Sequence, residues 1–396
     1  MIAIKNGKIV TPEQIIEGKI LLLKHDKIFG FVDSLENEDG VDRVVNAHGR
    51  YIIPGLIDVH SDKIEQYIQP RPTSQVDFEF GLKMCERDML GSGITTMYHS
   101  ISLFGDEFFG SSPLRTKENV QKIADLIAGI HLRNHLIHHR FHLRIEIDNP
   151  EAYDIACELI DQGKVHQISF MNHAPGQGQY SSMEIYQEAV VKYNGNLGGR
   201  TAKSMSIDEI MEYQRNKPKL SLHQLKELTK LAHIKGIPVA SHDDDTQEKL
   251  EENLGIGVDI SEFPISVETA KVAKSMGLYT VVGAPNILRG RSHSGNMSAT
   301  EAILEDCADI LCSDYYPAAI LHSVFSMNTK HGIPLQQMVN MVSLNPAKAM
   351  KIDKDYGSIE TGKKADILIV EMSDGYPLIT HAFVDGNPTS RIEYRR

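Results

Sequence analysis

Eight short apolar segments alternate with helix-like segments through the middle of the chain. Two of the intervening segments, residues 221–236 and 266–277, end at glycine, and residues 150–163 carry Pro150 in the first turn, as helices commonly do. The strand-like segments are residues 51–60, 93–100, 142–147, 166–173, 238–243, 257–264, 278–285 and 308–314. Eight strands alternating with helices over roughly 300 residues predict a (β/α)8 barrel of the TIM type.

A doubly wound open sheet is the competing fold, because it shows the same alternation of strands and helices. Such a sheet commonly carries a phosphate-binding GxGxxG or GxxxxGK[ST] loop after an early strand. Neither motif follows an early strand of this chain. The sequence therefore favours the barrel.

The two ends of the chain have a different character from its middle. Residues 1–52 contain short strand-like runs separated by turn signals, including an Asn-Gly pair at Asn6, and residues 355–396 return to this style. We therefore expect residues 1–52 and 355–396 to form one discontinuous β-sandwich domain. Residues 53–354 would then form the barrel.

The composition excludes several classes of protein. A formal charge of -12 argues against a nucleic-acid partner, because phosphate backbones attract clustered lysine and arginine. The N-terminus lacks a signal-peptide pattern, and no apolar run approaches the ~20 residues of a membrane span. The four cysteines show no metal-finger spacing, which fits a reducing compartment. We expect a protein of the cytoplasm without a membrane partner.

Ionisable side chains stand at the carboxyl ends of several predicted strands. Residues two apart on a strand share a face, so His60 and Asp62 should point the same way. In residues 142–147 the apolar side chains alternate with polar ones, and we expect Arg144 and Glu146 to point into the barrel. A neutral packed core would not favour such residues, and the carboxyl end of a barrel is where active sites form.

Six of these strand-end residues form a candidate metal-binding set of three histidines and three carboxylates. They are His60, Asp62, Glu146, His173, His242 and Asp314. Imidazole and carboxylate ligands suit one or two divalent ions of the Zn, Mn or Fe type. A cation would also offset the cost of burying several carboxylates together.

The alternative for each of these residues, taken alone, is a hydrogen-bonding or helix-capping role. The three aspartates at 243–245, directly after His242, are expected to include a helix N-cap. The joint position of the six residues at strand ends is what favours the metal site.

The chain also resembles a known family. Residues 54–60 and 357–370 resemble the amidohydrolase superfamily, metal-dependent hydrolases with a (β/α)8 barrel and a flanking β-sandwich. Six stretches are similar to the PhnM group of the carbon-phosphorus lyase pathway, namely residues 60–72, 142–147, 172–180, 240–246, 283–296 and 313–317. Members of that group hydrolyse α-D-ribose 1-methylphosphonate 5-triphosphate to the 5-phosphate and diphosphate.

The chain departs from the common pattern of the superfamily at two places. Asp62 stands where His-x-His is usual in the first strand, and no lysine ends the fourth strand. The carbamylated bridging lysine of many relatives therefore cannot form there, and Glu146 from the third strand is the expected substitute.

The resemblance implies hydrolysis of a phosphoanhydride by metal-activated water. We expect Asp314 to orient and deprotonate this water, with a low pKa because of the metals beside it. The phosphates of an anionic, nucleotide-like substrate need positive charge, for which arginine is well suited. The candidates are Arg71, Arg144, Arg289, Arg291 and His293. Surface solvation or a salt bridge is the alternative for Arg71 and Arg289.

Two other functions remain open at this stage. A deaminase or deacylase cleaving a C–N bond could use nearly identical ligands, and the arginine and glycine residues around the barrel mouth are what favour the diphosphatase. The second alternative is a scaffold protein that kept the fold and lost catalysis. Such a protein would be expected to have lost ligands, but all six proposed positions carry histidine, aspartate or glutamate. Barrel enzymes of this kind often self-associate, which leaves a homo-oligomer open.

Overall fold

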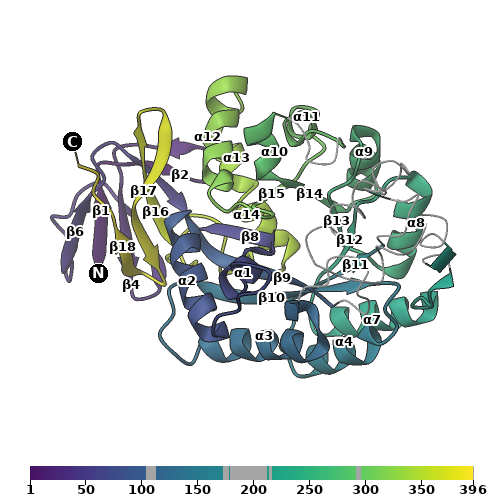
Figure 1. Cartoon of the computed structure of the whole chain (residues 1–396). Helices are drawn as coiled ribbons and strands as arrows, with labels where there is room; N and C mark the ends of the chain where they lie inside the picture. The colour runs from purple at the N-terminus through teal and green to yellow at the C-terminus, as the bar shows by residue number, and fades with distance from the viewer. Residues whose placement is uncertain (104–112, 173–177, 179–211, 214–215, 291–295, 396) are drawn as a thin grey trace.

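The structure is a computed structural model in which a barrel carries a smaller β domain on one side (Figure 1). It describes residues 1–103, 113–172, 178, 212–213, 216–290 and 296–395. The first and last strands of the chain both lie in the smaller domain. The β-rich ends of the sequence therefore come together in space.

The barrel consists of eight parallel strands in sequence order. They are β8 (Leu56–Ser61), β9 (Ile94–Leu103), β10 (His138–Glu146), β11 (Gln167–Met171), β12 (Val239–His242), β13 (Ile260–Glu262), β14 (Tyr279–Gly283) and β15 (Ile310–Cys312). A parallel bridge between Ser61 and Asp314 joins the last strand to the first. Each of the eight strands overlaps one of the segments predicted from the sequence, although β8, β9 and β10 extend beyond theirs, and the (β/α)8 prediction is confirmed.

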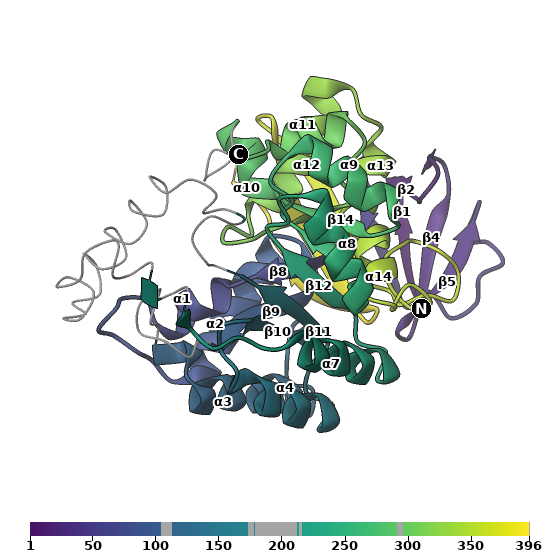
Figure 2. The ribbon, with the colours of Figure 1, turned by 90° about the vertical axis from the view of Figure 1, so that its right-hand side faces the viewer.

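Helices cover the outside of the barrel. They include α2 (Phe78–Gly91), α3 (Lys117–Ile130), α4 (Ala152–Asp161), α7 (Leu222–Ile234), α8 (Gln247–Ile256), α9 (Val267–Ser275), α11 (Ala299–Leu304) and α12 (Ala319–His331). Figures 1 and 2 show α3, α4 and α7 side by side on one flank. Shorter helical segments occur at α1 (Lys63–Ile68), η1 (Pro113–Arg115), α10 (Ala284–Arg289), α13 (Leu335–Asn340) and α14 (Leu344–Ala349).

The strand pattern decides which side chains face the helices and which face the barrel interior. Leu143 and Ile145 of β10 pack in the large core between the strands and the helical layer. The opposite face of the strands forms a separate interior core, to which Val59, Tyr98 and Ile260 belong, and Ala349 at the end of helix α14 (Leu344–Ala349) packs against it. The predicted division of residues 142–147 into an outward apolar face and an inward polar face is confirmed.

The N-cap expected among residues 243–245 was wrongly placed. Helix α8 begins after Thr246, whose side chain accepts a hydrogen bond from the Lys249 N–H (3.1 Å). Asp244 is instead buried, where it accepts hydrogen bonds from the hydroxyls of Ser241 and Ser261. A buried polar network therefore takes the side chain that the sequence pattern offered to the helix.

The smaller domain contains two sheets. The first has the order β5-β4-β1-β6, with β1 (Ile2–Lys5), β4 (Ile20–Lys24), β5 (Lys27–Val32) and β6 (Arg43–Asn46). The second has the order β18-β17-β16-β7-β2-β3, with β2 (Lys8–Val10), β3 (Ile15–Ile16), β7 (Tyr51–Pro54), β16 (Ile367–Ser373), β17 (Tyr376–Val384) and β18 (Asn387–Arg391). Side chains of both sheets, such as Leu21 and Ile367, share one hydrophobic core, as in a β-sandwich.

The chain passes from the sandwich to the barrel at Gly55. Strand β7 ends at Pro54 and β8 begins at Leu56, so only one residue separates a sandwich strand from a barrel strand. A side chain at Gly55 would collide with Thr95, because an added Cβ would lie 2.1 Å from its Oγ1. The proposed domain limits at residues 52 and 355 stay a prediction, although β7 carries the sandwich sheet two residues further.

Two further observations bear on the sequence analysis. The four cysteines are free thiols, as their spacing predicts. Across the part of the chain that the structure describes, no helix has the length and apolar character needed to cross a bilayer.

We expect Gly386→Ala to weaken the sandwich domain. Gly386 has a left-handed backbone (φ +70°), and an added Cβ would lie 1.9 Å from the carbonyl oxygen of His25. The added methyl group would push residue 386 away from the His25 carbonyl. This should lower the free energy of unfolding by about 2 kcal/mol or more, measured by thermal unfolding. The matched control is Gly375→Ala, where φ is +82° but no atom lies within 4 Å. Equal losses in both variants would contradict the role of this close contact.

Candidate active site

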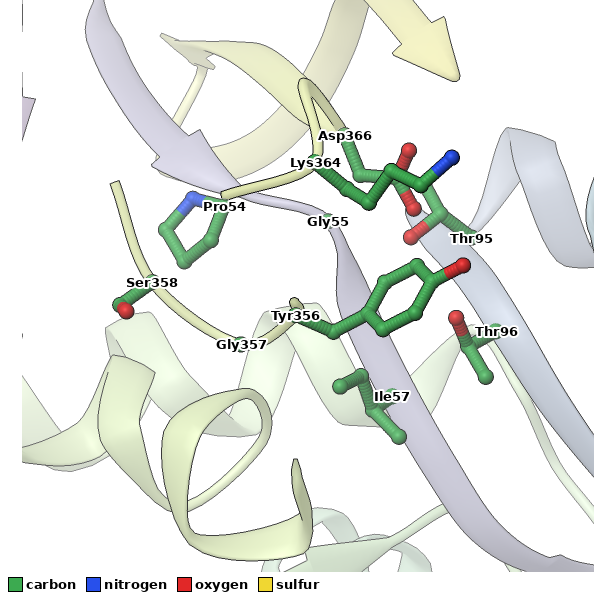
Figure 3. Close-up of a pocket in the computed structure, with 10 residues that line it drawn as sticks. All are labelled: Pro54, Gly55, Ile57, Thr95, Thr96, Tyr356, Gly357, Ser358, Lys364 and Asp366. Atoms are coloured by element: carbon green, nitrogen blue, oxygen red, sulfur yellow. The ribbon is translucent and has the colours of Figure 1, made fainter. Parts of the chain in front are cut away.

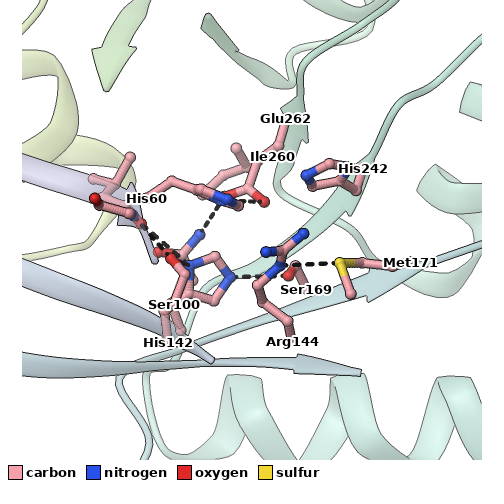
Figure 4. Close-up of polar contacts among 12 residues, drawn as sticks. His60, Ser100, His142, Arg144, Ser169, Met171, His242, Ile260 and Glu262 are labelled. Carbon is pink, nitrogen blue, oxygen red and sulfur yellow. Dashed lines mark hydrogen bonds and ion pairs between the residues drawn. The ribbon is translucent and has the colours of Figure 1, made fainter. Parts of the chain in front are cut away.

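Three ionisable side chains from the ends of three barrel strands meet at the barrel mouth. His60 is next to last in β8, His242 ends β12 and Glu262 ends β13. One nitrogen or carboxylate oxygen of each lies within 4.8 Å of those of the other two. Figure 4 shows the three side chains pointing toward one another. We call His60, His242 and Glu262 the mouth cluster.

The contact between His60 and Glu262 lacks the geometry of a hydrogen bond. His60 Nδ1 lies 3.1 Å from Glu262 Oε2, and neither atom has a hydrogen-bond partner among the described residues, although both are buried. Burial, together with the charges of Arg144 and His242, holds the pKa of His60 well below its ordinary value, so its imidazole is neutral. A nitrogen lone pair and a carboxylate oxygen facing each other inside a protein are a suitable pair of ligands for a divalent cation.

The side chain of Glu262 is held in place from below. Gln167, the first residue of β11, donates from Nε2 to Glu262 Oε1 (2.8 Å), and both residues are fully buried. One carboxylate oxygen is therefore engaged while the other faces His60. Hydrogen bonds of this kind orient the ligands of metal sites.

The backbone turns sharply within two residues of the ends of three barrel strands, β12, β13 and β15. Asp243, Phe263 and Asp314 have left-handed backbones, with φ of 55°, 57° and 55°. This conformation costs a residue other than glycine of order 1 kcal/mol, and such residues concentrate at functional sites. Phe263 packs against the rings of His60 and His242, with centroids 5.0 and 5.1 Å away. The turns thus position the side chains that surround the mouth cluster.

Strand β10 places a histidine and an arginine on the same inward face. His142 is fully buried, with Nε2 2.9 Å from Ser169 Oγ and Nδ1 3.1 Å from Ser100 Oγ. Burial lowers the pKa of His142 to about 3, so this ring is neutral and both its nitrogens are engaged within the protein. Arg144, two residues nearer the mouth, donates from Nε to the sulfur of Met171 (3.0 Å) and is only half-buried (Figure 4).

Asp62 and Asp314 lie together where the barrel closes. The N–H of Asp314 donates to the carbonyl of His60 (3.0 Å), and the N–H of Asp62 donates to the carbonyl of Asp314 (3.3 Å). Burial, and next the charge of Asp62, raise the pKa of Asp314 to about 7. The low pKa expected for Asp314 is therefore not produced by the surrounding side chains alone, and a bound cation would act in the opposite direction.

A second buried aspartate stands below this pair. Asp58 accepts a hydrogen bond from the Ser313 N–H (3.0 Å), and burial raises its pKa to about 6. Its other oxygen, Oδ2, has no hydrogen-bond partner among the described residues. The closing seam between β8 and β15 therefore carries three carboxyl groups, which increases the negative potential near the mouth cluster.

Glu146 ends β10 and is also buried. Its charge acts on Arg115, which lies in η1 and makes two hydrogen bonds from Nε to the carboxylate of Glu65 (2.9 and 3.1 Å). Glu65 belongs to α1, the short helix that follows Asp62. An arginine with carboxylate neighbours therefore borders this side of the mouth.

The structure accounts differently for the residues predicted from the sequence. His60 and His242 come together in the mouth cluster, and His242 is shown to end the fifth barrel strand. Asp62, Glu146 and Asp314 are not part of that cluster, and their ligand roles stay a prediction. Arg71 and Arg289 are exposed. His173, Arg291 and His293 lie outside the described residues.

Glu262 is the member of the cluster that the sequence analysis missed. It ends a predicted strand, in residues 257–264, as Glu146 ends another. Its spacing of two from Ile260 places it on the inward face, and this signal was available in the sequence. Its partners Gln167 and His60 lie far from it in the sequence, so the local pattern alone did not mark it as a ligand.

Comparisons with a protein-family model and with a known relative point to the same protein family. The model described as the amidohydrolase family matches residues 213–392. The chain is 32% identical over 388 residues to the α-D-ribose 1-methylphosphonate 5-triphosphate diphosphatase of Escherichia coli K12, covering 97% of this chain and 98% of the relative. The chain belongs to the amidohydrolase family. Its members are hydrolases, and the resemblance to the PhnM group is confirmed.

More distant members of the amidohydrolase family show the breadth of its chemistry. The 5-methylthioadenosine/S-adenosylhomocysteine deaminase of Acetivibrio thermocellus is 20% identical, over 99% of this chain and 89% of the relative. The crystal structure of N-acetylglucosamine-6-phosphate deacetylase from Pasteurella multocida superimposes with a TM-score of 0.65 at 14% identity, over 98% of both chains. Similarity at this level shows the shared fold and not the substrate.

We expect Glu262→Gln to weaken metal binding at the mouth. The amide keeps the size of the side chain but removes the negative charge facing His60, so affinity for Zn²⁺ or Mn²⁺ should fall by at least about tenfold. Metal content after dialysis, measured by inductively coupled plasma mass spectrometry, reports the loss. The control is Glu268→Gln, in the first turn of α9. Unchanged metal content in Glu262→Gln would exclude this residue as a ligand.

Proposed function

We propose that the protein hydrolyses the α–β phosphoanhydride of α-D-ribose 1-methylphosphonate 5-triphosphate, releasing the 5-phosphate and diphosphate in phosphonate catabolism. The observation that carries this proposal is the 32% identity, over almost the entire length of both chains, to a diphosphatase of that name. The deaminases that match over most of the chain are 20–23% identical. A small anionic substrate of this kind also agrees with the arginine at the barrel mouth.

The residues of the mouth fit a site for one or two divalent ions of the Zn, Mn or Fe type. His60, His242 and Glu262 would hold such an ion, and Asp62, Glu146, His173 and Asp314 are the further proposed ligands. When bound, the ions would lower the pKa of a water molecule and polarise a phosphoryl oxygen.

Asp314 is the proposed proton acceptor. Its carboxylate would orient a water molecule and take its proton while the water oxygen attacks the α-phosphorus. The bond between the α-phosphorus and the bridging oxygen then breaks, and diphosphate leaves with that oxygen. The left-handed backbone at Asp314 presents its side chain at the closing seam of the barrel, beside Asp62. The surrounding side chains raise the pKa of Asp314 to about 7, and a bound cation would lower it, so Asp314 would act as a weak base aided by its position beside the water.

Arg144 is the proposed phosphate-binding residue that the structure describes best. Its charge acts on the pKa of His60, His142 and Asp314, so its guanidinium lies within electrostatic range of all three. Its planar group can donate two parallel hydrogen bonds to phosphate oxygens. Arg71, Arg289, Arg291 and His293 stay further proposed contacts to the triphosphate.

The location and the partners of the protein are also proposals. Four free cysteines agree with a reducing compartment such as the cytoplasm. The proposed partner is the small anionic substrate alone, without nucleic acid or membrane, and a homo-oligomer remains open.

The deciding experiment measures diphosphate release from ribose 5-triphosphate compounds, with and without added Mn²⁺ or Zn²⁺. We expect metal-dependent release by the wild-type protein and a loss of at least about a hundredfold in kcat for Asp314→Asn, because the amide cannot accept the proton. Release of ammonia from nucleoside substrates, without diphosphate release, would favour a deaminase. Equal diphosphate release by both proteins would refute the role of Asp314.

A second experiment tests Arg144. We expect Arg144→Met to raise KM for the triphosphate by about tenfold or more, since a charged hydrogen bond to phosphate contributes about 1.5–3 kcal/mol. The effect should be smaller for a monophosphate inhibitor, which offers fewer negative charges. Arg391→Met, in strand β18 of the sandwich, serves as the control. An unchanged KM in Arg144→Met would show that the phosphates bind elsewhere.

A further inference from the structure

A second group of ligand-type side chains lies at the opposite end of the barrel. His138 begins β10, whereas Glu146 ends the same strand at the mouth. Asp366 directly precedes β16 and Asp385 directly follows β17, so both come from the sandwich domain. One nitrogen or carboxylate oxygen of each of these three residues lies within 4.8 Å of those of the other two. We call His138, Asp366 and Asp385 the basal cluster.

Each carboxylate of the basal cluster has one oxygen held by the protein. Asp366 Oδ1 accepts a hydrogen bond from the Asp385 N–H (2.9 Å), and Asp385 Oδ1 accepts one from Lys364 Nζ (2.8 Å). The second oxygens face the histidine, because His138 Nε2 lies 3.2 Å from Asp366 Oδ2 and 3.8 Å from Asp385 Oδ2. Carboxylates that ligate a metal typically use one oxygen for the metal, while hydrogen bonds to the protein orient the group.

Two of the ligand-type atoms of the basal cluster are buried and lack hydrogen bonds. His138 and Asp366 are each only 7% exposed, and neither His138 Nε2 nor Asp366 Oδ2 has a hydrogen-bond partner among the described residues. The nearby hydroxyls of Thr95 and Thr96 are buried and lack partners as well. Buried polar atoms without partners are costly, so their concentration here indicates a missing ligand.

The distances between His138 Nε2 and the two carboxylate oxygens can be compared with those of a hydrogen bond and of a metal site. A hydrogen bond between charged groups is usually about 2.7–2.9 Å long. Two ligands of a tetrahedral ion with bonds of about 2.0–2.1 Å lie about 3.3 Å apart. The 3.2 Å between His138 Nε2 and Asp366 Oδ2 is close to the second value, and the 3.8 Å to Asp385 Oδ2 is longer than both.

The electrostatic surroundings also attract positive charge. Two carboxylates, those of Asp366 and Asp385, lie within 4.0 Å of His138 Nε2. Asp26 adds a third carboxylate, which shares Lys364 with Asp385. Three carboxylates against Lys364 and the half-buried Arg140 leave the site negative when His138 is neutral.

We propose that the basal cluster binds a divalent transition-metal ion through His138 Nε2, Asp366 Oδ2 and Asp385 Oδ2, and that this ion fastens the sandwich to the base of the barrel. Imidazole with two carboxylates is a ligand set for ions of the Zn or Mn type. Figure 3 shows Asp366 in the neighbouring pocket, with Lys364 and Thr95 close to it. The amino ends of barrel strands serve stability, so this ion is structural.

The test uses Zn²⁺ and a full-length parent protein in which His60→Ala, His242→Ala and Glu262→Gln remove all three ligands of the mouth cluster. We expect about one zinc ion per chain after dialysis of this parent, measured by mass spectrometry. Adding His138→Gln should remove that ion, and Asp385→Asn should weaken zinc binding at least about tenfold in titration calorimetry. His381→Gln, in strand β17, is the matched control and should bind zinc like the parent.

A thermal measurement separates a structural ion from an incidental one. The parent protein should unfold at a higher temperature with zinc than with a chelator, and His138→Gln should lose this difference. The proposal is overturned if the parent and the His138→Gln variant hold the same amount of zinc, or if zinc leaves the unfolding temperature of the parent unchanged. No substrate is involved, so the outcome is independent of the proposed diphosphatase activity.

Discussion

The closure of the barrel is the constraint on which the site depends. The hydrogen bonds from the Asp314 N–H to the His60 carbonyl, and from the Asp62 N–H to the Asp314 carbonyl, join the last strand to the first. Without this seam, the ends of β8 and β15 would belong to opposite edges of an open sheet. With it, residues near both ends of the barrel sequence surround one mouth, where buried carboxylates face the imidazoles of His60 and His242.

Buried charge explains why two places in the barrel are candidate cation sites. The barrel mouth collects carboxylates from the closing seam and from β13, and burial raises the pKa of Asp58 and Asp314 because no fixed positive charge neutralises them fully. The base of the barrel repeats the situation with Asp366 and Asp385 around His138. The proposed roles of the two sites differ because the mouth lies at the end of the barrel where active sites form, whereas residues at the base contribute to stability.

The apolar and polar pattern of the sequence predicted the strands and helices well, and it predicted side-chain contacts less well. Period-two alternation in residues 142–147 predicted that Arg144 and Glu146 face inward, because the pleat of a strand admits no other choice. The expected aspartate cap before α8 was wrong, because the Asp244 carboxylate accepts hydrogen bonds from hydroxyls on two neighbouring strands. Glu262 was missed for a related reason: its partners Gln167 and His60 lie far from it in the sequence.

The sequence by itself determined the order of strands and helices, the barrel fold and the inward position of the strand-end residues, because these follow from the periodicity of apolar residues along the chain. Only the tertiary structure decided which of those residues meet. Whether His60 faces Glu262, and whether His138 faces two aspartates of another domain, depends on strand register and on domain packing. Both are set by contacts between distant segments, which no local pattern encodes.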